Sequence, residues 1–400
     1  MNAYLAKKIR KTGTFWYVVV SETDYTGKQK KTWHTDPKTG KGFITKGLAK
    51  KHMADLLSSG NKGIYVSPNK LLFADLLNDF LSTKKMEVTE STFVKYEQLV
   101  RVHIKPNLGN IPAQKLTTQH LNACYAKLLE VGKQTNHKGG QGLAAKSVRH
   151  IHVLVNATLE QAVKHDLLVK NVAQNAIVPK SANKKMTIFT VSELNTFLEG
   201  IQGTEFETLF NFYARTGCRR GEALGLTWRN VDWINSTVTI EQSLDRIHGK
   251  AYISQPKTKN SFRTFEIDRE LLKALDQIAI QQQKSKMQLG SGYTDSDFVF
   301  CEPNGQWLNP NRIYNHFISL RDKLGLPNSV RLHDLRGTHI TMLLASGTNP
   351  KYVAERVGDS VETIMEFYAQ TYAMEGSAAL NRLEQMLNEN KEFPNRLRSA

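Results

Sequence analysis

The stretch "ARTGCRRGEALGLTW", residues 214–228, interrupts a run of apolar and aromatic residues with a polar turn. Gly217 follows an aromatic segment of helical character and predicts a helix end with a tight turn. Arg219 then opens a second helix, and Glu222 lies three positions later on the same face. An arginine held at a helix N-terminus by a carboxylate is ready to bind a phosphate through two hydrogen bonds. The spacing is equally consistent with a surface Arg–Glu pair, which contributes only ~0.2–1 kcal/mol.

A second polar cluster, "RLHDLRGTHI" at residues 331–340, pairs an imidazole with a guanidinium. His333 and Arg336 are three positions apart, so both project from one face of a helix that begins near Asp334. Such a pair suits a reacting phosphate, because the imidazole handles protons and the guanidinium neutralises charge. Taken alone, the pattern is also that of a helix-capping histidine beside a surface arginine.

A lysine-rich turn, "SQPKTKNSFRTFEI" at residues 254–267, is the third candidate. The pattern predicts a β-hairpin with Lys257 at its tip, between a strand around Tyr252 and a strand around Phe265. A lysine on a mobile turn can reach into a site and act as a general acid. The alternative is an ordinary solvated hairpin lysine.

The composition points to a polyanionic partner. The chain of 400 residues has a formal net charge of +17 and a pI near 9.6, and 40% of its residues are hydrophobic. Such a surplus attracts nucleic acid or an anionic membrane surface. No apolar run approaches the roughly 20 residues of a membrane span, and the N-terminus lacks the apolar core of a signal peptide. Nucleic acid is therefore the expected partner, in a cytoplasmic protein.

Metal and disulfide sites are not expected. The three cysteines are odd in number, far apart and without a Cys-x-x-Cys pair, which fits a reducing cytoplasm. Arg149, His150 and His152 stand close together, but no carboxylate or thiol accompanies them at ligand spacing. A solvated, phosphate-facing helix surface is the preferred interpretation of that group.

The first 62 residues hold 13 Lys/Arg against 4 Asp/Glu, about half of the total charge surplus. "TFWYVVVSE" and "KKTWHT", residues 14–22 and 30–35, predict two strands joined by a turn. Residues 45–59 predict a helix, with Thr45 as N-cap and Gly60 as its stop. A small sheet with one lysine-rich helix suits a DNA-binding module, and a solvated basic appendage is the alternative.

Helical periodicity continues from Leu71 to about Asn175 and predicts a bundle of four or five helices. Its breaks are expected at "KPNLGN", residues 105–110, and at the glycine-rich residues 133–142. A basic linker, residues 178–187, follows. The remaining residues mix helices with three short β segments, at 236–243, 250–256 and 262–268.

Taken together, these residues and their order resemble the tyrosine recombinases, the integrase family of phages and conjugative transposons. Residues 214–228 are similar to the first arginine box, TGxRxxE, and residues 331–347 to the HxxR box. "VGDSVETIMEFY", residues 357–368, resembles the last box, in which the nucleophilic tyrosine follows a histidine by nine positions. The resemblance covers the whole chain, and its three-box catalytic pattern is specific.

The resemblance implies a multidomain fold that is mainly α with small β elements. Residues 1–65 are expected to form an arm-type DNA-binding domain of a small sheet plus a helix, and residues 66–180 a helical core-binding domain. Residues 186–400 are expected to form the mixed α/β catalytic domain with a C-terminal tail helix. That helix, residues 375–390, has an apolar stripe that packs on its own domain or docks on a neighbour in a cyclic tetramer.

The resemblance also implies roles for individual residues. Arg219 and Arg336 clamp the non-bridging oxygens of a scissile DNA phosphate, and Tyr368 attacks phosphorus to give a 3′-phosphotyrosine. Lys257 protonates the leaving 5′-oxygen, His333 assists proton movement, and Glu222 orients the first arginine box. No metal or cofactor is required, because the guanidiniums and the lysine supply the positive charge. The family pattern favours Lys257 over Lys259, and Tyr368 over Tyr372.

Asp359 departs from the family pattern, which usually has histidine, sometimes tryptophan, at this sixth catalytic position. An ionised carboxylate cannot donate a hydrogen bond to a phosphate and repels it. Three interpretations follow: Asp359 is turned away to pair with an arginine such as Arg356, it binds phosphate through water or as the neutral acid, or the protein is a weak catalyst. His339 is a possible compensating group, and a core histidine is the preferred interpretation.

The expected function is that of a site-specific DNA recombinase, or integrase, which integrates or excises a mobile element without ATP. The expected partners are double-stranded DNA at core and arm sites, three further copies of the chain in a homotetramer, and accessory DNA-bending proteins. The expected location is the nucleoid of a bacterial cell, with no membrane association. The alternatives are a catalytically weakened DNA-binding regulator with the same fold, and a type IB topoisomerase-like enzyme.

Overall fold

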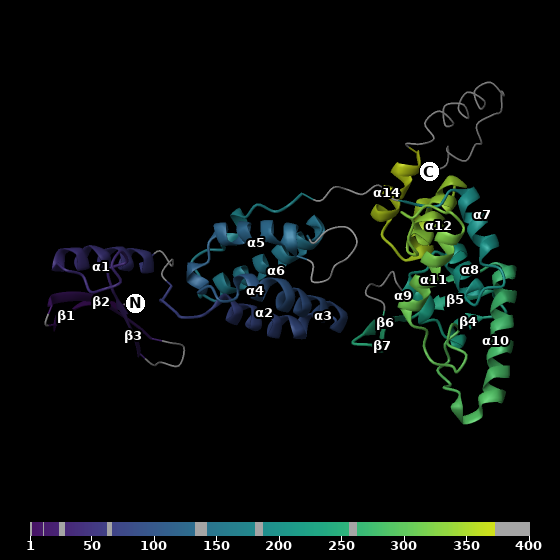
Figure 1. The fold of residues 1–400 in the computed structure, drawn as a ribbon, viewed down its shortest axis with the longest axis horizontal. Coiled ribbons are helices and arrows are strands. Elements are labelled where there is room, and N and C mark those ends of the chain that lie inside the picture. The colour runs from purple at the N-terminus through teal and green to yellow at the C-terminus, as the bar shows by residue number, and fades with distance from the viewer. Residues whose placement is uncertain are drawn as a thin grey trace, which may run out of the picture. The chain divides into compact units, whose positions relative to one another are not determined.

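The computed structural model describes residues 2–10, 12–23, 29–61, 66–132, 142–180, 187–255 and 262–372 of the chain (Figure 1). The chain divides into two compact units, Met1–Asn183 and Lys184–Ala400. The described part is mainly helical, with small antiparallel sheets, as the sequence predicts. None of its helices combines the length and the apolar character that crossing a membrane requires.

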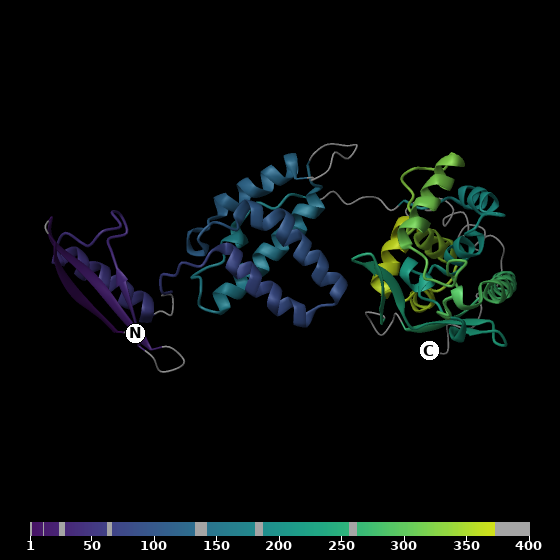
Figure 2. The same ribbon diagram turned by 60° about the horizontal axis from the view of Figure 1, so that its bottom comes forward.

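The N-terminal part of the first unit is a three-stranded antiparallel sheet with one helix. The sheet has the order β1 (Asn2–Arg10), β2 (Gly13–Thr23), β3 (Gln29–His34). Helix α1 (Lys46–Asn61) lies against β1 and β2, as Figure 2 shows. Buried Val18 and Val20 of the central strand pack with Phe43 and Ala49 between sheet and helix. The hydroxyl of Thr45 accepts from the N–H of Leu48 at 3.3 Å, in agreement with its predicted role as N-cap.

The sequence predicted two strands in this part, which correspond to β2 and β3, but the structure has a third, β1. β1 pairs with β2 along its whole length, although it has lysines and an arginine in its second half. As an edge strand it buries little, so its sequence lacks the clear apolar alternation from which strands are predicted.

The second part of the first unit is a helical bundle, as predicted. Its α-helices are α2 (Phe73–Glu87), α3 (Glu90–Leu99), α4 (Lys105–Leu108), α5 (Thr118–Val131) and α6 (Ala145–Lys164). A π-helical segment, Val100–Ile104, joins α3 to α4, and two 3₁₀ turns lie at Ala113–Lys115 and Val172–Asn175. The core includes Phe73, Leu77, Ile104, Leu121 and Ile151, each of which is fully buried.

The predicted break at residues 105–110 begins four residues too early. The chain stays helical through Leu108, because Pro106 lies in the first turn of α4, where a proline needs no partner for the N–H that it lacks. The break that follows is at Gly109 and Asn110. The predicted break at residues 133–142 lies almost entirely outside the described ranges.

The second unit packs helices around two small sheets. Its α-helices are α7 (Val191–Gly200), α8 (Glu207–Thr216), α9 (Arg220–Leu224), α10 (Arg269–Leu289), α11 (Pro310–Lys323), α12 (Asp334–Ala345), α13 (Pro350–Val357) and α14 (Val361–Tyr372). Two 3₁₀ turns occupy Trp228–Asn230 and Gly290–Gly292. An aromatic core centred on Phe197, Phe210 and Phe317 holds α7, α8 and α11 together.

The sheets correct the predicted hairpin around Lys257. One sheet has the order β4 (Val231–Asp232), β5 (Thr237–Ile240), β8 (Arg263–Glu266), and the other pairs β6 (Ser243–Ile247) with β7 (Lys250–Ser254). The strands around Tyr252 and Phe265 exist, but they belong to different sheets and are not paired with each other. The segment that contains Lys257, residues 256–261, connects the two sheets and lies outside the described residues.

Candidate active site

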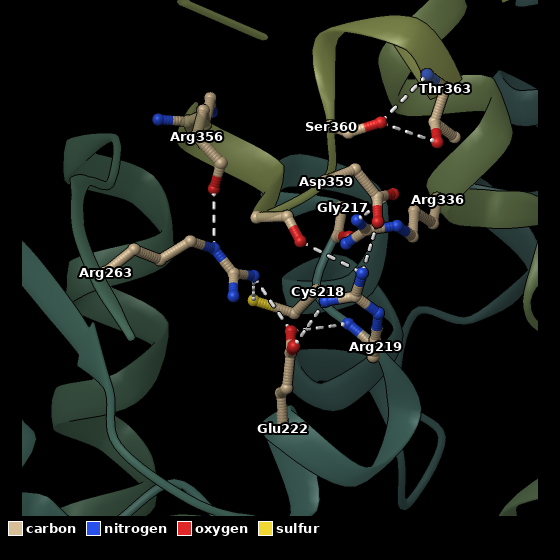
Figure 3. Close-up of polar contacts among 11 residues, drawn as sticks. Gly217, Cys218, Arg219, Glu222, Arg263, Arg336, Arg356, Asp359, Ser360 and Thr363 are labelled. Atoms are coloured by element: carbon tan, nitrogen blue, oxygen red, sulfur yellow. Dashed lines mark hydrogen bonds and ion pairs between the residues drawn. The ribbon is translucent and has the colours of Figure 1, made fainter. Parts of the chain in front are cut away.

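The first arginine box folds as its sequence predicts. Helix α8 ends at Thr216, and Gly217 adopts a left-handed conformation with φ 65° that turns the chain. Arg219 is the N-cap of α9, and its backbone N–H donates to the Glu222 carboxylate at 3.0 Å. The same carboxylate accepts from Arg219 Nη1 at 2.9 Å. The guanidinium is therefore held at the helix N-terminus, with its other edge toward Gly358 and Asp359 (Figure 3).

A buried ion pair lies behind this box. Glu222 also accepts from Arg263 Nη2 of β8 at 2.8 Å, and the side chains of both are at most 6% exposed. Burial opposes ionisation of the Glu222 carboxyl, but the hydrogen bond and the charge of Arg263 hold its pKa below the ordinary value. Arg263 Nε donates in addition to the backbone carbonyl of Arg356, in α13, at 2.8 Å.

Sequence reasoning missed Arg263. Its strand alternates buried and exposed residues, with Arg263 and Phe265 buried and Thr264 and Glu266 exposed. An arginine at an inward position of a short strand demands a buried acid. The alternation of the strand is therefore the sequence signal that could have identified Arg263 as a buried residue.

The HxxR box opens α12. His333 is the residue before the helix, and Arg336 lies in its first turn with a side chain only 3% exposed. Arg336 Nη1 donates to the carbonyl of Gly217 at 2.7 Å, which ties α12 to the turn after α8. Burial, and then the positive charge of Arg336, lower the pKa of His333 and so favour its neutral form.

His339 is a core histidine, which was the preferred interpretation of its sequence. It is 8% exposed, and its Nδ1 donates to the carbonyl of Ala214 at 3.0 Å. Burial lowers the pKa of its imidazole to about 4. Its Nε2 has no hydrogen-bond partner in the described part of the chain.

The carboxylate of Asp359 joins the two arginine boxes. Helix α13 ends at Val357, and Gly358, with φ 72°, turns the chain so that Asp359 points back into the cluster. One carboxylate oxygen accepts from Arg219 Nη2 and the other from Arg336 Nη2, the latter at 2.5 Å (Figure 3). The side chain is 22% exposed.

The interpretation in which Asp359 turns away to pair with an arginine such as Arg356 was wrong in direction and in partner, because the carboxylate faces both arginine boxes and pairs with Arg219 and Arg336. Arg356 Nη1 donates instead to the carbonyl of Glu266 at 3.0 Å. The separation of 140 residues between Arg219 and Asp359 hides the true pairing from local pattern. Burial, and then the charge of Arg219, lower the pKa of Arg336, while the charge of Asp359 opposes that effect.

The remaining candidates differ in how far the structure describes them. Tyr368 lies in the last part of α14, but its side chain is outside the described atoms. Ser360 caps that helix by accepting from the N–H of Thr363 at 3.2 Å. Lys257 is not among the described residues. The structure thus brings together Arg219, Glu222, His333, Arg336 and Asp359, and it does not test the positions of the lysine and of the tyrosine hydroxyl.

A hollow of about 410 Å³ adjoins His333. Arg220 of α9 and Arg331, before α12, both line it, together with Tyr314 of α11. Its two arginines outnumber its one acid, Asp245, so the lining is suited to an anionic ligand.

No group of three or more His, Cys, Asp or Glu side chains is placed to hold a metal ion within the described ranges. His152, one of the residues considered for such a group, is instead hydrogen-bonded to the hydroxyl of Tyr125 at 3.1 Å.

Three family models match successive parts of the chain. Residues 5–59 match the arm DNA-binding domain, residues 72–129 the N-terminal SAM-like domain of phage integrases, and residues 184–375 the phage integrase family. The chain belongs to the phage integrase family of tyrosine recombinases. This family is a class of enzymes that cleave and rejoin DNA.

Relatives of this integrase-family chain are integrases and recombinases of bacteria and of a phage. The ICEBs1 integrase of Bacillus subtilis is 25% identical over 320 residues, which are 79% of this chain and 83% of the relative. A XerC-like tyrosine recombinase of Caldanaerobacter subterraneus is 24% identical over 335 residues, which are 79% of this chain and 83% of the relative. The integrase of Staphylococcus phage L54a is 30% identical over 167 residues, 40% of this chain and 47% of the relative.

Solved structures of integrases share the fold. The Tn1549 transposon integrase, in complex with transposon right-end DNA, matches with a TM-score of 0.66 and 21% identity, over 78% of this chain and 100% of that chain. A lambda integrase tetramer bound to a Holliday junction matches with a TM-score of 0.53 and 16% identity, over 91% of this chain and 94% of that chain.

Proposed function

We propose that this recombinase binds a scissile DNA phosphate between Arg219 and Arg336. The observation that carries the proposal is that both guanidiniums direct an Nη2 at one anion, the carboxylate of Asp359. They come from two different helix starts, α9 and α12, so their convergence depends on the fold and not on sequence proximity. Two guanidiniums that share one anion suit a phosphorus centre whose oxygens gain negative charge during reaction.

In the proposed reaction, the DNA strand is cleaved at the phosphate that the two arginines bind. The Tyr368 oxygen attacks phosphorus, the bond from phosphorus to the 5′-oxygen breaks, and a 3′-phosphotyrosine forms. Lys257 gives a proton to the leaving 5′-oxygen, and neutral His333 accepts or relays protons beside the phosphate. Glu222 positions Arg219. Because the phosphodiester bond is exchanged and not hydrolysed, a second 5′-hydroxyl can reverse the reaction on another strand without ATP.

The proposed substrate is double-stranded DNA, recognised by three parts of the chain. Residues 1–65 would bind arm sites, residues 66–180 core sites, and residues 186–400 the cleavage site. The net charge of +17 supports this, and Arg220 and Arg331 beside His333 provide a place for the DNA backbone near the clamp. A homotetramer agrees with the lambda integrase tetramer found on a Holliday junction. The proposed substrate is mobile-element DNA in the bacterial nucleoid. Accessory DNA-bending proteins are proposed as further partners.

A covalent-adduct experiment tests the function. The full chain is incubated with nicked suicide substrates from candidate attachment sites, and protein–DNA adducts are separated on a denaturing gel. The wild type should form an adduct, Tyr368→Phe should form none, and Tyr372→Phe should retain it. If Tyr368→Phe formed the adduct and Tyr372→Phe did not, the nucleophile would be Tyr372, one helical turn later.

One observation favours a second function, that of a DNA-binding regulator without cleavage. The carboxylate of Asp359 lies between the two arginines, and its negative charge opposes the binding of a phosphate there. Specific DNA binding without any adduct in the wild type would support the regulator and reject the recombinase.

A further inference from the structure

We propose that Asp359 is a placeholder anion, which holds the two-arginine site in the DNA-free protein and leaves it when the scissile phosphate binds. The proposal rests on the proposed function, because it assigns to Asp359 the place of the substrate phosphate. It makes Asp359 a residue that sets the affinity of the site for phosphate and takes no part in bond making.

The arginines keep their orientation without Asp359. Arg219 Nη1 remains bound to Glu222 at 2.9 Å, and its Nη2 also donates to the carbonyl of Gly358 at 3.0 Å. Arg336 Nη1 remains bound to the carbonyl of Gly217 at 2.7 Å. These contacts use fixed backbone groups and a buried acid. The two Nη2 groups that now face Asp359 can therefore receive another anion without rearrangement.

The charge of the cluster favours an exchange over simultaneous binding. Arg219, Arg263 and Arg336 face two acids, Glu222 and Asp359, which leaves one positive charge in excess. A phosphodiester carries one negative charge, as Asp359 does, so replacing one by the other keeps this balance. If both anions stayed, two like charges would share one site, and each would weaken the binding of the other.

The position of Asp359 permits its exit. It lies between α13 and α14, directly after Gly358, and its side chain is 22% exposed. The apolar residues that pack α12, α13 and α14 together, among them Ile340, Val357 and Ile364, are fully buried and hold the helices in place. Rotation of one carboxylate toward solvent leaves this core intact.

Phosphate binding to the DNA-free full chain tests the exchange directly. The thermal unfolding midpoint is measured across concentrations of inorganic phosphate for the wild type, Asp359→Asn and Asp297→Asn. Asp297→Asn is the matched control: it removes the same charge, its φ of 58° suits asparagine, and among the described residues its carboxylate pairs only with exposed Arg229, at 3.8 Å.

Asp359→Asn should unfold at a lower temperature without phosphate, because two arginines lose their anion. Its half-maximal stabilisation should require at least about tenfold less phosphate than that of the wild type or of Asp297→Asn. Asp359→His should show the same shift and serves as the second variant if the asparagine protein does not fold. Identical phosphate curves for Asp359 variants and the control would overturn the proposal.

The rate of adduct formation gives a second, independent readout. At DNA concentrations below saturation, Asp359→Asn should form the covalent adduct several-fold faster than the wild type, whereas Asp297→Asn should form it at the wild-type rate. A large loss of rate at saturating DNA would identify Asp359 as a group that acts on the reacting atoms, and would overturn the placeholder role. If no protein forms an adduct, the proposed function fails, whereas the phosphate titration still decides the exchange.

Discussion

Glu222 and Arg263 form an ion pair at 2.8 Å in which neither side chain is more than 6% exposed. Through it, β8 is fixed to the first turn of α9. Through the bond from Arg263 to the carbonyl of Arg356, the same strand is fixed to α13. The pair thus links β8 to α9, which begins directly after Arg219, and through Arg263 to α13, which ends two residues before Asp359.

Removing Arg263 should therefore destabilise the protein and misplace the arginine box. Arg263→Met leaves Glu222 buried without its main partner, which should cost about 3–5 kcal/mol in the free energy of unfolding. Lys286→Met, which breaks an exposed pair with Asp295, should cost less than about 1 kcal/mol. Chemical unfolding of the full chain measures both. Equal costs would contradict a structural role for the buried pair.

Arg263→Lys separates positioning from stability. A lysine retains the charge opposite Glu222 but cannot also reach the Arg356 carbonyl with a second, fixed N–H. We expect most of the stability to return, with adduct formation still reduced at saturating DNA. Recovery of both properties would show that the contact with α13 is dispensable.

Features set by neighbouring residues were predictable from the sequence. The helix end at Gly217, the start of α9 at Arg219 and the start of α12 after His333 all follow from residues within four positions. Local hydrogen bonds at helix ends depend on few residues, so their sequence signals are strong.

Features set by distant partners were not predictable. β7 and β8 are consecutive, yet β8 pairs with β5 and β7 with β6, because pairing depends on the packing of the whole unit. Asp359 finds its arginines 140 and 23 residues away. Pairing with an arginine was one of three interpretations of Asp359 from the sequence, and only the fold brings Arg219 and Arg336 to it.

Gly217 should not tolerate a side chain. Its left-handed φ of 65° disfavours alanine, and an added Cβ would lie 2.7 Å from Cδ2 of His339. Gly203→Ala is the matched control, because Gly203 has φ 71° and open space around it. Gly217→Ala should lose at least about 1 kcal/mol more in chemical unfolding than Gly203→Ala. It should also slow adduct formation, since Gly217 binds Arg336. Equal stabilities would mean that His339 moves aside freely.

The buried imidazole of His339 should make stability depend on pH. Its pKa is lowered to about 4 in the folded protein, against about 6.5 in the unfolded chain, so the unfolded state binds more protons between these values. The stabilisation is complete above pH 6.5 and is lost as the pH falls toward 4, by about 3 kcal/mol in total.

His339→Phe should flatten this dependence. Unfolding titrations at pH 7, 6, 5 and 4 should show a smaller acid loss in the variant than in the wild type, whatever its stability at pH 7. His248→Asn is the control, since His248 is exposed and its φ of 49° suits asparagine. An unchanged slope in His339→Phe would assign the acid sensitivity to other groups, of which His333 is the first to test.

The assignment of Lys257 as general acid predicts a rescue by substrate chemistry. Lys257→Ala should reduce adduct formation on ordinary DNA by about 10²–10⁴-fold, because the 5′-oxygen then leaves without a proton. A substrate with sulfur in place of that bridging oxygen has a leaving group that needs no proton, so the variant should cleave it nearly as fast as the wild type does. Lys259→Ala should cleave both substrates at wild-type rates. Rescue seen for Lys259→Ala and not for Lys257→Ala would exchange the two assignments, and loss without rescue would make Lys257 a phosphate-binding residue.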